Sequence, residues 1–397
     1  MSAPYLWDDA RARRFAPFAL TRPAGELRAG AVLGRERWTR LLGRDVAGFV
    51  AEAHLAGFDE AGAPRAVDVV PAGAVLANSR CLPSLGQSSG AADAWTCGGR
   101  LAAVRLARDV TAEELATTTA LDELRTGTTS AELAGRWLDE IWDLVASLPD
   151  LLADDVRALA TTLEVDGAPA GATVLGAHEV FVERGAVVEP MVCLDVTAGP
   201  ILLRRGATVS SFTRLVGPCY VGEHSTVIGG RVAATSIGEW CKVSGEVNSA
   251  IFHSYANKGH EGFVGHSVIG RWANLGAGTT TSNLKNTYGP VQLWTPDGVR
   301  ETGLQFLGTL VGDHAKTAIG TRLNTGTVVG AGANVFGGAV PGKAVRPFAW
   351  GEGGMPAIYD LERFLQVAER VMRRRGVALS EGARRQLSAA YARASAS

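Results

Sequence analysis

Three of the seven histidines stand close together in the chain, at His253, His260 and His266. Their spacings, H-x6-H and H-x5-H, do not match the ligand spacing of a structural zinc site. A single imidazole with a pKa near 7 is instead well suited to act as a general base. The stretch from 248 to 266 therefore predicts a base-assisted reaction, with one of the three histidines taking the proton.

A second group of residues with chemical potential lies near the N-terminus. Arg22 and Arg28 occupy a stretch that contains glycine and proline and that follows a possible strand. Two guanidinium groups in such a segment could bind a pyrophosphate bidentately. The residues alone favour the other interpretation, in which both are solvated loop arginines.

The elements that must position the histidines show a six-residue period from about 182 to 345. Apolar residues return every six positions, and a small or compact residue usually follows four places later. This period fits neither an α-helix nor a simple strand; it fits a coiled sheet with three short faces and about 18 residues per coil. A glycine-rich sandwich or a disordered tract would not require a fixed phase. The apolar positions are Val182, Val188, Leu194, Leu203, Val209, Leu215, Val221, Val227, Ile237, Val243, Ile269, Leu275, Val311, Thr317, Leu323 and Val329.

The histidine stretch interrupts this repeat between Val247 and Ile269. Each coil of a solenoid buries its apolar positions against its neighbours, so the stack supplies the core. Departures from the repeat lie on the surface, where a rigid scaffold presents functional residues. The interruption is therefore the predicted location of the site.

The remaining sequence indicates two further domains. Residues 1–178 lack the period and alternate strand-like with helix-like segments, which favours a layered α/β domain. Two helices are expected near its end, one that begins at Thr111 and a second that runs through 137–145. Residues 179–347 form the repeat domain. Residues 348–397 form a tail with an amphipathic helix that ends near Gly376.

Composition restricts the classes of partner. The 397 residues carry a net charge of −1, which gives no general attraction to nucleic acid or anionic membrane. The five cysteines form no C-x-x-C pair and are expected to be reduced. The N-terminus lacks the basic and apolar segments of a signal peptide, and no apolar run is long enough for a membrane span, so a cytoplasmic protein is expected.

The hexads V-G-E-H-S-T and L-G-A-G-T-T resemble the left-handed parallel β-helix of hexapeptide acyltransferases. The stretch N-K-G-H-E-G-F-V-G-H-S-V-I-G-R-W-A-N-L-G-A-G-T-T-T-S-N, from Asn257 to Asn283, resembles the acetyltransferase site of the bifunctional GlmU enzymes. Those enzymes make UDP-N-acetylglucosamine from glucosamine 1-phosphate, acetyl-CoA and UTP. The resemblance implies a homotrimer, in which coenzyme A binds between neighbouring solenoids.

The resemblance also implies roles for individual residues. His260 would be the base and Glu246 the carboxylate that orients it. Phe263, Asn274 and Asn283 would surround the sugar amine and phosphate, while Ala277, Gly312 and Ala331 would provide backbone and space for coenzyme A. The base would free the amine lone pair, and a backbone N–H near Ala277 would stabilise the oxyanion.

Two positions depart from the GlmU pattern. Asn248 stands where that family has a lysine that binds the sugar phosphate, and Arg231 lies one place from the expected arginine. The missing charge would then come from Lys258, Lys285 or Arg231. The identity of the phosphate-bearing acceptor stays open at this level.

The first half lacks the signature L-x-x-G-x-G-T-R-M of common nucleotidyltransferases. It resembles a divergent GlmU-like branch of sugar nucleotidyltransferases, with T-R-P-x-x-x-x-R at 21–28, N-x-R at 78–80 and W-L-D-E-I-W-D at 137–143. By that resemblance Arg22, Arg28, Asn78 and Arg80 would bind the UTP phosphates. A Mg²⁺ ion would bridge them, with Asp8, Asp9 and Asp195 as candidate ligands.

The leading hypothesis is a bifunctional enzyme that acetylates glucosamine 1-phosphate and couples the product to UMP. One alternative is a single-activity hexapeptide acyltransferase with a degenerate front domain. Another is a nucleotidyltransferase for a different sugar 1-phosphate. The third is a non-catalytic trimeric scaffold, which acetyl-CoA binding would separate from the acetyltransferase hypotheses.

Overall fold

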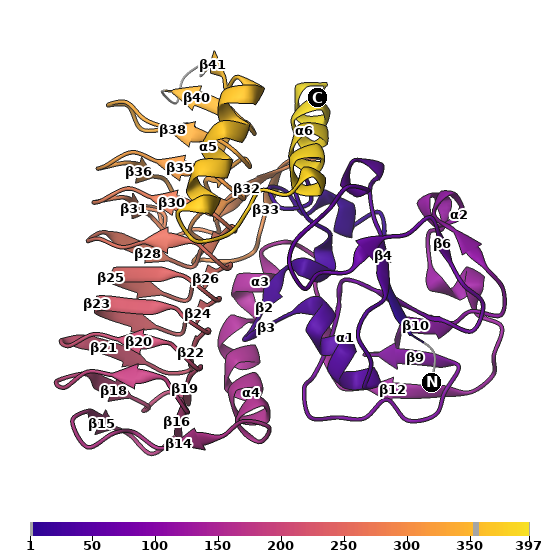
Figure 1. The fold of residues 1–397 in the computed structure, drawn as a ribbon, viewed down its shortest axis with the longest axis horizontal. Coiled ribbons are helices and arrows are strands. Elements are labelled where there is room, and N and C mark those ends of the chain that lie inside the picture. Colours follow the sequence, from indigo (N-terminus) through magenta and orange to yellow (C-terminus); the bar gives the residue numbers. More distant parts are fainter. Residues whose placement is uncertain (1–2, 352–356, 397) are drawn as a thin grey trace. The chain divides into compact units, whose positions relative to one another are not determined.

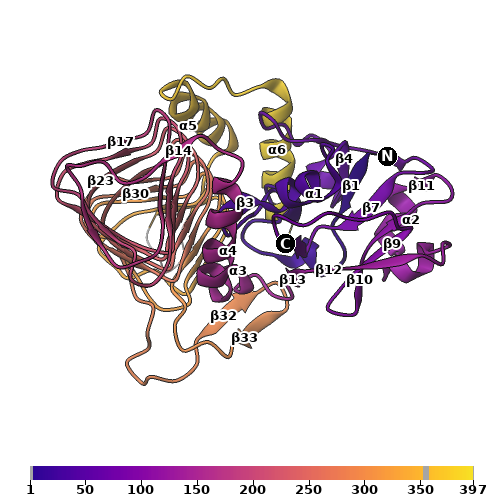
Figure 2. The same ribbon diagram turned by 90° about the horizontal axis from the view of Figure 1, so that it is seen from below.

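The chain is represented by a computed structural model that describes residues 3–351 and 357–396. It divides into two compact units, Trp142–Gly376 and Met1–Ile141 with Val377–Ser397. The first of these is a β-solenoid whose short parallel strands stack as rungs (Figure 1). Seen along the stack, successive coils superpose in one closed outline (Figure 2). The predicted repeat domain is thus confirmed, while the hand of the coil stays a prediction.

Each coil has three faces, named here the first, second and third face in chain order. The first face comprises β14 (Val165–Asp166), β16 (Val180–Glu183), β19 (Ile201–Leu203), β22 (Cys219–Val221), β24 (Ser236–Ile237), β26 (Ile251–Phe252), β29 (Val268–Ile269), β34 (Leu310–Val311), β37 (Val328–Val329) and β39 (Ala344–Val345). The second face comprises β17 (Val187–Val188), β20 (Thr208–Val209), the first halves of β23 (Thr226–Ala233) and β25 (Lys242–Asn248), then β27 (Asn257–Lys258), β30 (Asn274–Leu275), β35 (Lys316–Thr317), β38 (Asn334–Val335) and β40 (Ala349–Gly351), which β41 (Ala357–Ile358) joins antiparallel. The third face comprises β15 (Thr173–Leu175), β18 (Cys193–Asp195), β21 (Thr213–Val216), the second halves of β23 and β25, and β28 (Phe263–Gly265), with β31 (Thr280–Thr281) and β36 (Arg322–Leu323) as a separate pair.

The six-residue period has a direct structural cause. Parallel register places the apolar hexad residues of successive coils above one another, as in the run Val182, Leu203, Val221 and Ile237 on the first face. All four belong to one continuous buried core. Burial of each aliphatic side chain contributes about 1.5–3 kcal/mol, so the stack stabilises coils that could not fold singly.

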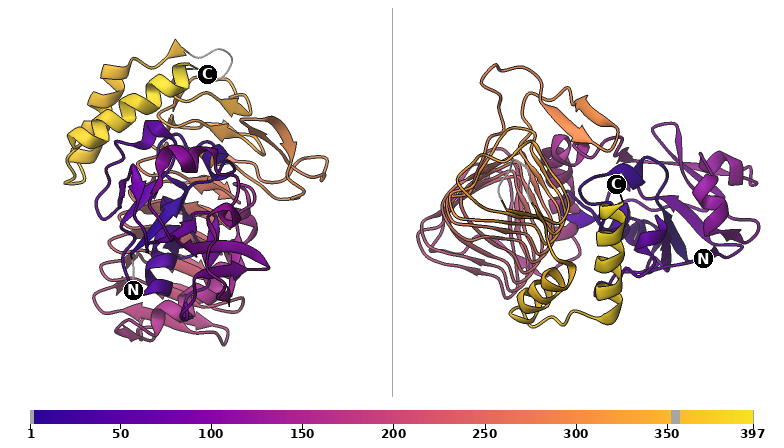
Figure 3. Two further views of the ribbon diagram at one scale, coloured as in Figure 1. Left: turned by 90° about the vertical axis from the view of Figure 1, so that its right-hand side faces the viewer. Right: turned by 90° about the horizontal axis from the view of Figure 1, so that it is seen from above.

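A ladder of stacked aromatic rings follows the corner between the first and second faces. Trp240 stacks on His224 at a centroid distance of 4.4 Å, and Tyr255 stacks on Trp272 at 4.0 Å. Helix α5 (Leu361–Arg373) lies along this corner (Figure 3, right). Its Phe364 ring contacts the His314 and Phe348 rings edge-on, at 6.0 and 5.0 Å.

One long insertion leaves the solenoid between β31 and β34. It contains a two-stranded hairpin, β32 (Gln292–Thr295) and β33 (Gly298–Glu301), which projects from the coils (Figure 2). The Arg300 guanidinium lies over the Trp142 ring at 5.4 Å. This contact fixes the hairpin against the segment that precedes α3 (Asp143–Ala146) and α4 (Leu148–Ala160).

The other unit is built on a seven-stranded sheet with the order β12-β9-β10-β7-β1-β4-β5. Its strands are β12 (Ser130–Leu133), β9 (Ala94–Cys97), β10 (Arg100–Arg105), β7 (Val75–Asn78), β1 (Pro4–Trp7), β4 (Gly48–Val50) and β5 (Arg65–Ala66). Strand β1 pairs in parallel with both β7 and β4. Leu6 and Trp7 point to opposite faces, and each joins a separate hydrophobic cluster. A buried sheet covered on both sides confirms the predicted α/β layering.

Helices and short strand pairs complete this unit. The helices are α1 (Gly34–Leu42), α2 (Ala112–Thr117) and α6 (Glu381–Ser395). The strand pairs are β2 (Arg28–Ala29) with β3 (Val32–Leu33), β6 (Val69–Val70) with β11 (Val110–Thr111), and β8 (Cys81–Pro83) with β13 (Gly135–Trp137). Thr111 caps α2 as predicted, because its hydroxyl accepts the Glu114 N–H. The helix predicted through 137–145 is wrong in its first half, where Trp137 pairs with Cys81 in a strand.

The structural division falls at residues 141 and 376, whereas the sequence placed boundaries at 178 and 347. Helix α4 packs against β19 and β22, so it belongs with the solenoid. The tail is shared between the units. Helix α5 contacts the aromatic ladder, whereas Gln386 of α6 donates to the Thr21 carbonyl at 2.9 Å.

Candidate active site

Three predicted site residues stand side by side on the outer surface of the third face. The register pairs Arg231 of β23 with Glu246 of β25, and Glu246 with Phe263 of β28. Neighbouring strands lie about 4.8 Å apart, so these side chains form one row. The residue after each of them is a fully buried valine. We call Arg231, Glu246 and Phe263 the site row.

His260 lies in the corner turn that leads into the site row, formed by residues 259–262 and called here the His260 turn. Five positions separate Lys258 from Phe263, whereas three separate their partners Val243 and Glu246 in the coil beneath. The corner in the coil beneath is thus two residues shorter than the His260 turn, whose length recurs from Leu275 to Thr280 and from Thr317 to Arg322. His260 is exposed. In the part of the chain that the structure describes, no hydrogen bond joins His260 to Glu246. Catalytic hydrogen bonds often tighten only with substrate present.

Phe263 and Asn283 converge over Gly265. A Cβ atom on Gly265 would stand 2.5 Å from Phe263 Cζ and 2.6 Å from Asn283 Nδ2. The absence of a side chain at this position therefore allows an aromatic ring and an amide to meet. Phe263 directly follows the His260 turn in the chain, and Asn283 meets its ring across Gly265.

His266 is one of the three histidines from which the sequence predicted a base, although the resemblance to GlmU assigned it no role. Asn283 Nδ2 lies 2.8 Å from His266 Nδ1. The amide nitrogen can only donate, so His266 Nδ1 accepts and the imidazole is neutral. Burial lowers the pKa of His266, which favours the same state. The available signal was the grouping of three histidines in one stretch. The predicted interruption of the repeat there is wrong, because the stretch forms a regular coil with Phe252, Lys258 and Val264 buried at a spacing of six.

Asn274 lies on the second face, on the other side of the His260 turn. Its Oδ1 atom accepts a hydrogen bond of 2.7 Å from Asn257 Nδ2, and Lys316 is its strand partner in the next coil. Asn274 and the site row thus belong to different faces, and the turn that carries His260 is the corner between them.

The three candidates for the missing positive charge are placed differently. Arg231 is exposed in the site row. Lys285 extends from the insertion, and its ammonium donates to the Pro290 carbonyl at 2.8 Å. Lys258 faces the interior with 2% of its surface exposed. The guanidinium of Arg231 is therefore the best placed of the three to meet a phosphate.

The residues predicted to contact coenzyme A occupy two corners of the solenoid. Gly312 and Ala331 are buried between successive coils, where a Cβ on Gly312 would stand 2.6 Å from Ala331 N. They lie at the corner between the first and second faces. Ala277 lies between the second and third faces, and its carbonyl accepts the Gly320 N–H at 2.7 Å. Of these three residues of one chain, Ala277 is the one that lies at the same corner as the His260 turn.

In the N-terminal unit, predicted nucleotide-binding residues gather at the carboxyl edge of the sheet. Asp9 follows β1, and Asn78 and Arg80 lie at the end of β7. Asn78 Nδ2 donates to Asp9 Oδ2 at 2.9 Å, and Arg80 Nη2 lies 2.6 Å from the same oxygen. Arg80 Nη1 also contacts Asp139 Oδ1 at 3.0 Å. Burial opposes ionisation of Asp9, but the hydrogen bonds and charge of Arg80 prevail and lower its pKa.

Arg22 and Arg28 are buried rather than solvated, which corrects the loop interpretation of this stretch. Arg22 is 3% exposed and forms a 2.9 Å ion pair with Glu60. Arg28 is 1% exposed and donates to the Ala31 carbonyl at 2.5 Å. Both are packed because the segment that contains them lies against α1 and folds into a short helical turn and the β2–β3 pair.

The candidate magnesium ligands do not form a magnesium site. Asp195 belongs to the solenoid unit and pairs with Arg214 at 2.5 Å. Burial raises the pKa of Asp8 to about 6, and the Asp9 carboxylate already forms an ion pair with the Arg80 guanidinium. Among the described residues, no group of three or more histidine, cysteine, aspartate or glutamate side chains is arranged to hold a metal ion.

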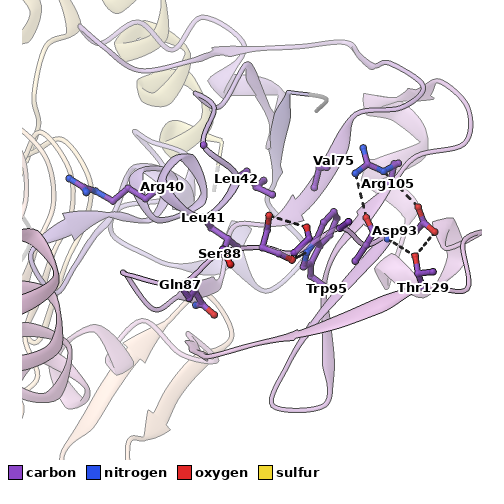
Figure 4. A pocket seen from close by; sticks show the side chains of 15 residues that line it. Arg40, Leu41, Leu42, Val75, Gln87, Ser88, Asp93, Trp95, Arg105 and Thr129 are labelled. Atoms are coloured by element: carbon purple, nitrogen blue, oxygen red, sulfur yellow. Dashed lines mark hydrogen bonds and ion pairs between the residues drawn. The ribbon is translucent and has the colours of Figure 1, made fainter. Parts of the chain in front are cut away.

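A cavity of about 700 Å³ lies elsewhere in this unit (Figure 4). It includes Val75, the first residue of β7, whereas Asn78 ends that strand. Trp95, Arg105 and Asp93 also line it. None of the four predicted nucleotide-binding residues does. The cavity therefore belongs to the opposite end of β7 from the Asn78–Arg80 cluster.

Comparison with known proteins finds similarity to sugar nucleotidyltransferases and acetyltransferases over part of the chain. Residues 5–163 match the family model described as sugar nucleotidyl transferase. A bifunctional sugar-1-phosphate nucleotidylyltransferase/acetyltransferase from Sulfurisphaera tokodaii is 31% identical over 100 residues, which are 25% of this chain and 25% of that protein. The bifunctional protein GlmU from Bartonella quintana is 26% identical over 175 residues, covering 42% of this chain and 34% of GlmU.

An uncharacterized acetyltransferase, YaiX from Escherichia coli strain 536, is 23% identical over 151 residues, covering 37% of this chain and 66% of that protein. The chain thus covers less than two thirds of the length of each relative. Among solved structures, a UDP-N-acetylglucosamine acyltransferase from Campylobacter jejuni aligns with 11% identity and a TM-score of 0.24, over 52% of this chain and 94% of that one. That structural likeness is too remote to support an argument about the site. Of the helices that the structure describes, none is both long and apolar enough to cross a membrane.

Over part of its length the chain is therefore similar to sugar nucleotidyl transferases, through residues 5–163, and to bifunctional nucleotidylyltransferase/acetyltransferase proteins such as GlmU.

Proposed function

We propose that the solenoid acetylates the amine of glucosamine 1-phosphate with acetyl-CoA, using His260 as general base. The observation that carries this proposal is the register of the site row. It aligns Arg231, Glu246 and Phe263 beside the turn that bears His260. A cation, a carboxylate, an aromatic ring and an imidazole on one edge fit an acceptor with a phosphate, an ammonium and a sugar ring.

Each residue type has a task in this reaction. The exposed His260 imidazole removes a proton from the sugar ammonium, so the amine lone pair can attack the thioester carbon. Glu246 orients the imidazole and stabilises its positive charge after proton transfer. The Phe263 ring and the Asn283 amide form the wall for the sugar. A backbone N–H near Ala277 donates to the oxyanion. The coenzyme A thiolate then leaves and takes up the second proton of the amine, which gives the amide and the free thiol.

Arg231 takes over the role of the missing phosphate-binding lysine. Asn248 pairs with Gly265 in the register, so no cation occupies that position. Arg214 is strand partner to Arg231 in the preceding coil, but Asp195 neutralises it. Arg231 is left to bind the phosphate, and its planar guanidinium suits two phosphate oxygens.

The N-terminal unit is proposed to transfer a uridylyl group from UTP to N-acetylglucosamine 1-phosphate. The match to the sugar nucleotidyl transferase model supports this activity. The carboxyl edge near Asn78 and Arg80 is its proposed nucleotide site, since ligands of open α/β sheets bind there. Arg22 and Arg28 are proposed to support this site by stabilising the segment that contains them. The carboxylates present do not fit a magnesium site, so no step of the reaction is assigned to that ion.

A homotrimer is the proposed assembly, because Gly312 and Ala331 lie at a different corner from Ala277. A neighbouring solenoid would supply the second wall for coenzyme A. Cytoplasmic location follows from the substrates of the proposed reaction.

Product formation tests the two activities separately. Mass spectrometry would follow acetylation of glucosamine 1-phosphate by acetyl-CoA, and in a second reaction UDP-N-acetylglucosamine formation from UTP and N-acetylglucosamine 1-phosphate with Mg²⁺ supplied. His260→Ala should abolish the first product only, and Arg22→Ala the second only. His178→Ala is the control, because that histidine is also exposed but lies outside the site. Acetylation that survives His260→Ala would refute the role of His260.

A further inference from the structure

Lys258 departs from the pattern of the solenoid interior. It occupies the inward position of the second face, where its partner in the preceding coil is Val243. Among the described residues of this inward row, it is the one charged side chain. The row comprises Val188, Val209, Val227, Val243, Lys258, Leu275, Thr317 and Val335.

A buried ammonium is expensive unless specific partners compensate for lost water. Lys258 Nζ donates to the Ser244 carbonyl at 2.9 Å and to the His260 carbonyl at 2.7 Å. No carboxylate in the described part of the chain forms an ion pair with it. The acidic residue that influences it is Glu261, in the same turn. Its bonded partners are therefore two backbone carbonyls, one in the His260 turn and one in the coil beneath.

The His260 turn creates the need for such a donor. The His260 carbonyl lies over the shorter corner of the coil beneath, where a Cβ on Gly245 would stand 3.2 Å from that oxygen and 3.1 Å from Lys258 Nζ. A buried carbonyl without a donor costs about as much as a lost hydrogen bond. The lysine supplies that donor and, through the Ser244 carbonyl, joins the His260 turn to the coil beneath.

We propose that Lys258 is a positioning residue for His260, because its side chain ties the inward carbonyl of the His260 turn to the coil beneath and so fixes the imidazole on the outer surface. This inference rests on the proposed acetyl transfer. It differs from the role suggested by the sequence, in which Lys258 would meet the sugar phosphate. A base displaced by about 1 Å can lose about 10²-fold in rate, so a rigid turn matters to the reaction.

Three variants separate the donor role from packing. Lys258→Met keeps the length and apolar stem but removes the donor, whereas Lys258→Gln retains an N–H₂ group. Lys316→Met is the matched control, since Lys316 Nζ donates to one backbone carbonyl, that of His314, in another coil. Steady-state acetylation and hydrogen exchange of the peptide containing 259–263 would be measured for each full-length variant.

We expect Lys258→Met to lower kcat by 10- to 100-fold with little change in the KM for acetyl-CoA, and to speed exchange in the His260 turn at least 10-fold. Lys258→Gln should recover part of both losses, and Lys316→Met should leave the turn protected. Wild-type kcat and exchange in Lys258→Met would overturn the inference, as would identical behaviour of the Met and Gln variants. If the wild type forms no acetylated product but Lys258→Met still loosens the turn, the acetylation proposal fails while the structural tie stands.

Discussion

The burial of Lys258 predicts an unusual dependence of stability on pH. Burial lowers the pKa of this lysine from 10.5 to about 8. Between these two values the unfolded chain holds a proton that the folded chain has released. The free energy of unfolding of the wild type should therefore rise with pH across this window. One pKa unit corresponds to about 1.36 kcal/mol, so the gain is about 3 kcal/mol at most.

The fold tolerates the deprotonation of Lys258 because a neutral amine can still donate hydrogen bonds. It retains two N–H donors, one for each of the carbonyl oxygens of Ser244 and His260, so deprotonation removes the cost of a buried charge without breaking the turn. Lys258→Met removes both the titration and the donors. Its destabilisation relative to the wild type should consequently grow as the pH rises from 8 to 10.5.

Urea unfolding at pH 7, 8, 9 and 10 would measure this difference, with tryptophan fluorescence as the signal. Lys316 provides an independent repeat, because burial lowers its pKa to about 8 as well. Lys316→Met should show the same trend. A difference between the wild type and Lys258→Met that is flat from pH 7 to 10 would refute the assignment of a neutral buried amine.

Three further substitutions test other parts of the structure. Arg80→Met should lower the free energy of unfolding of the N-terminal unit by about 3–5 kcal/mol in urea titrations, because Asp9 would keep a buried charge without its partner; a loss below 1 kcal/mol would contradict the buried pairing. Gly265→Ala should raise the KM for the amino sugar at least 10-fold, roughly the loss of one good contact, and leave that for acetyl-CoA unchanged, since a methyl group would displace Phe263; equal effects on both would contradict the placement. Phe364→Ala should cost about 3–5 kcal/mol and expose α5 to trypsin, and an uncut helix would show that Phe364 is not its anchor.

The fold of the solenoid could be predicted because one local rule generates it. An apolar residue at every sixth position meets its equivalents in the coils above and below, as Val182, Leu203 and Val221 do. The site row was harder to predict from the sequence, since its neighbours in space are 15 and 17 positions apart in the chain. The pairing of Glu246 with Phe263 depends on the length of the intervening turn, which periodicity alone does not supply.

The arginines of the N-terminal unit show why other features could not be predicted. Arg22 and Arg28 follow a proline- and glycine-containing pattern that normally indicates a solvated loop. Whether such a loop is buried depends on partners distant in sequence, here Glu60 for Arg22 and the strand pair for Arg28. The same limit applies to Trp137, whose strand partner is Cys81. Local propensity favoured a helix there, and pairing across more than 50 positions prevailed.

For Lys258, residue type and strand register point in opposite directions. In the sequence its charge suggested a contact with phosphate, because lysines are normally exposed. The period places it at an inward position, and the register of β27 with β25 confirms that direction. Its two acceptors are carbonyl oxygens at this corner, that of His260 and that of Ser244 in the coil beneath. The corner beneath is two residues shorter than the His260 turn, so the conflict between residue type and register marks the coil where the corner length changes and His260 is presented.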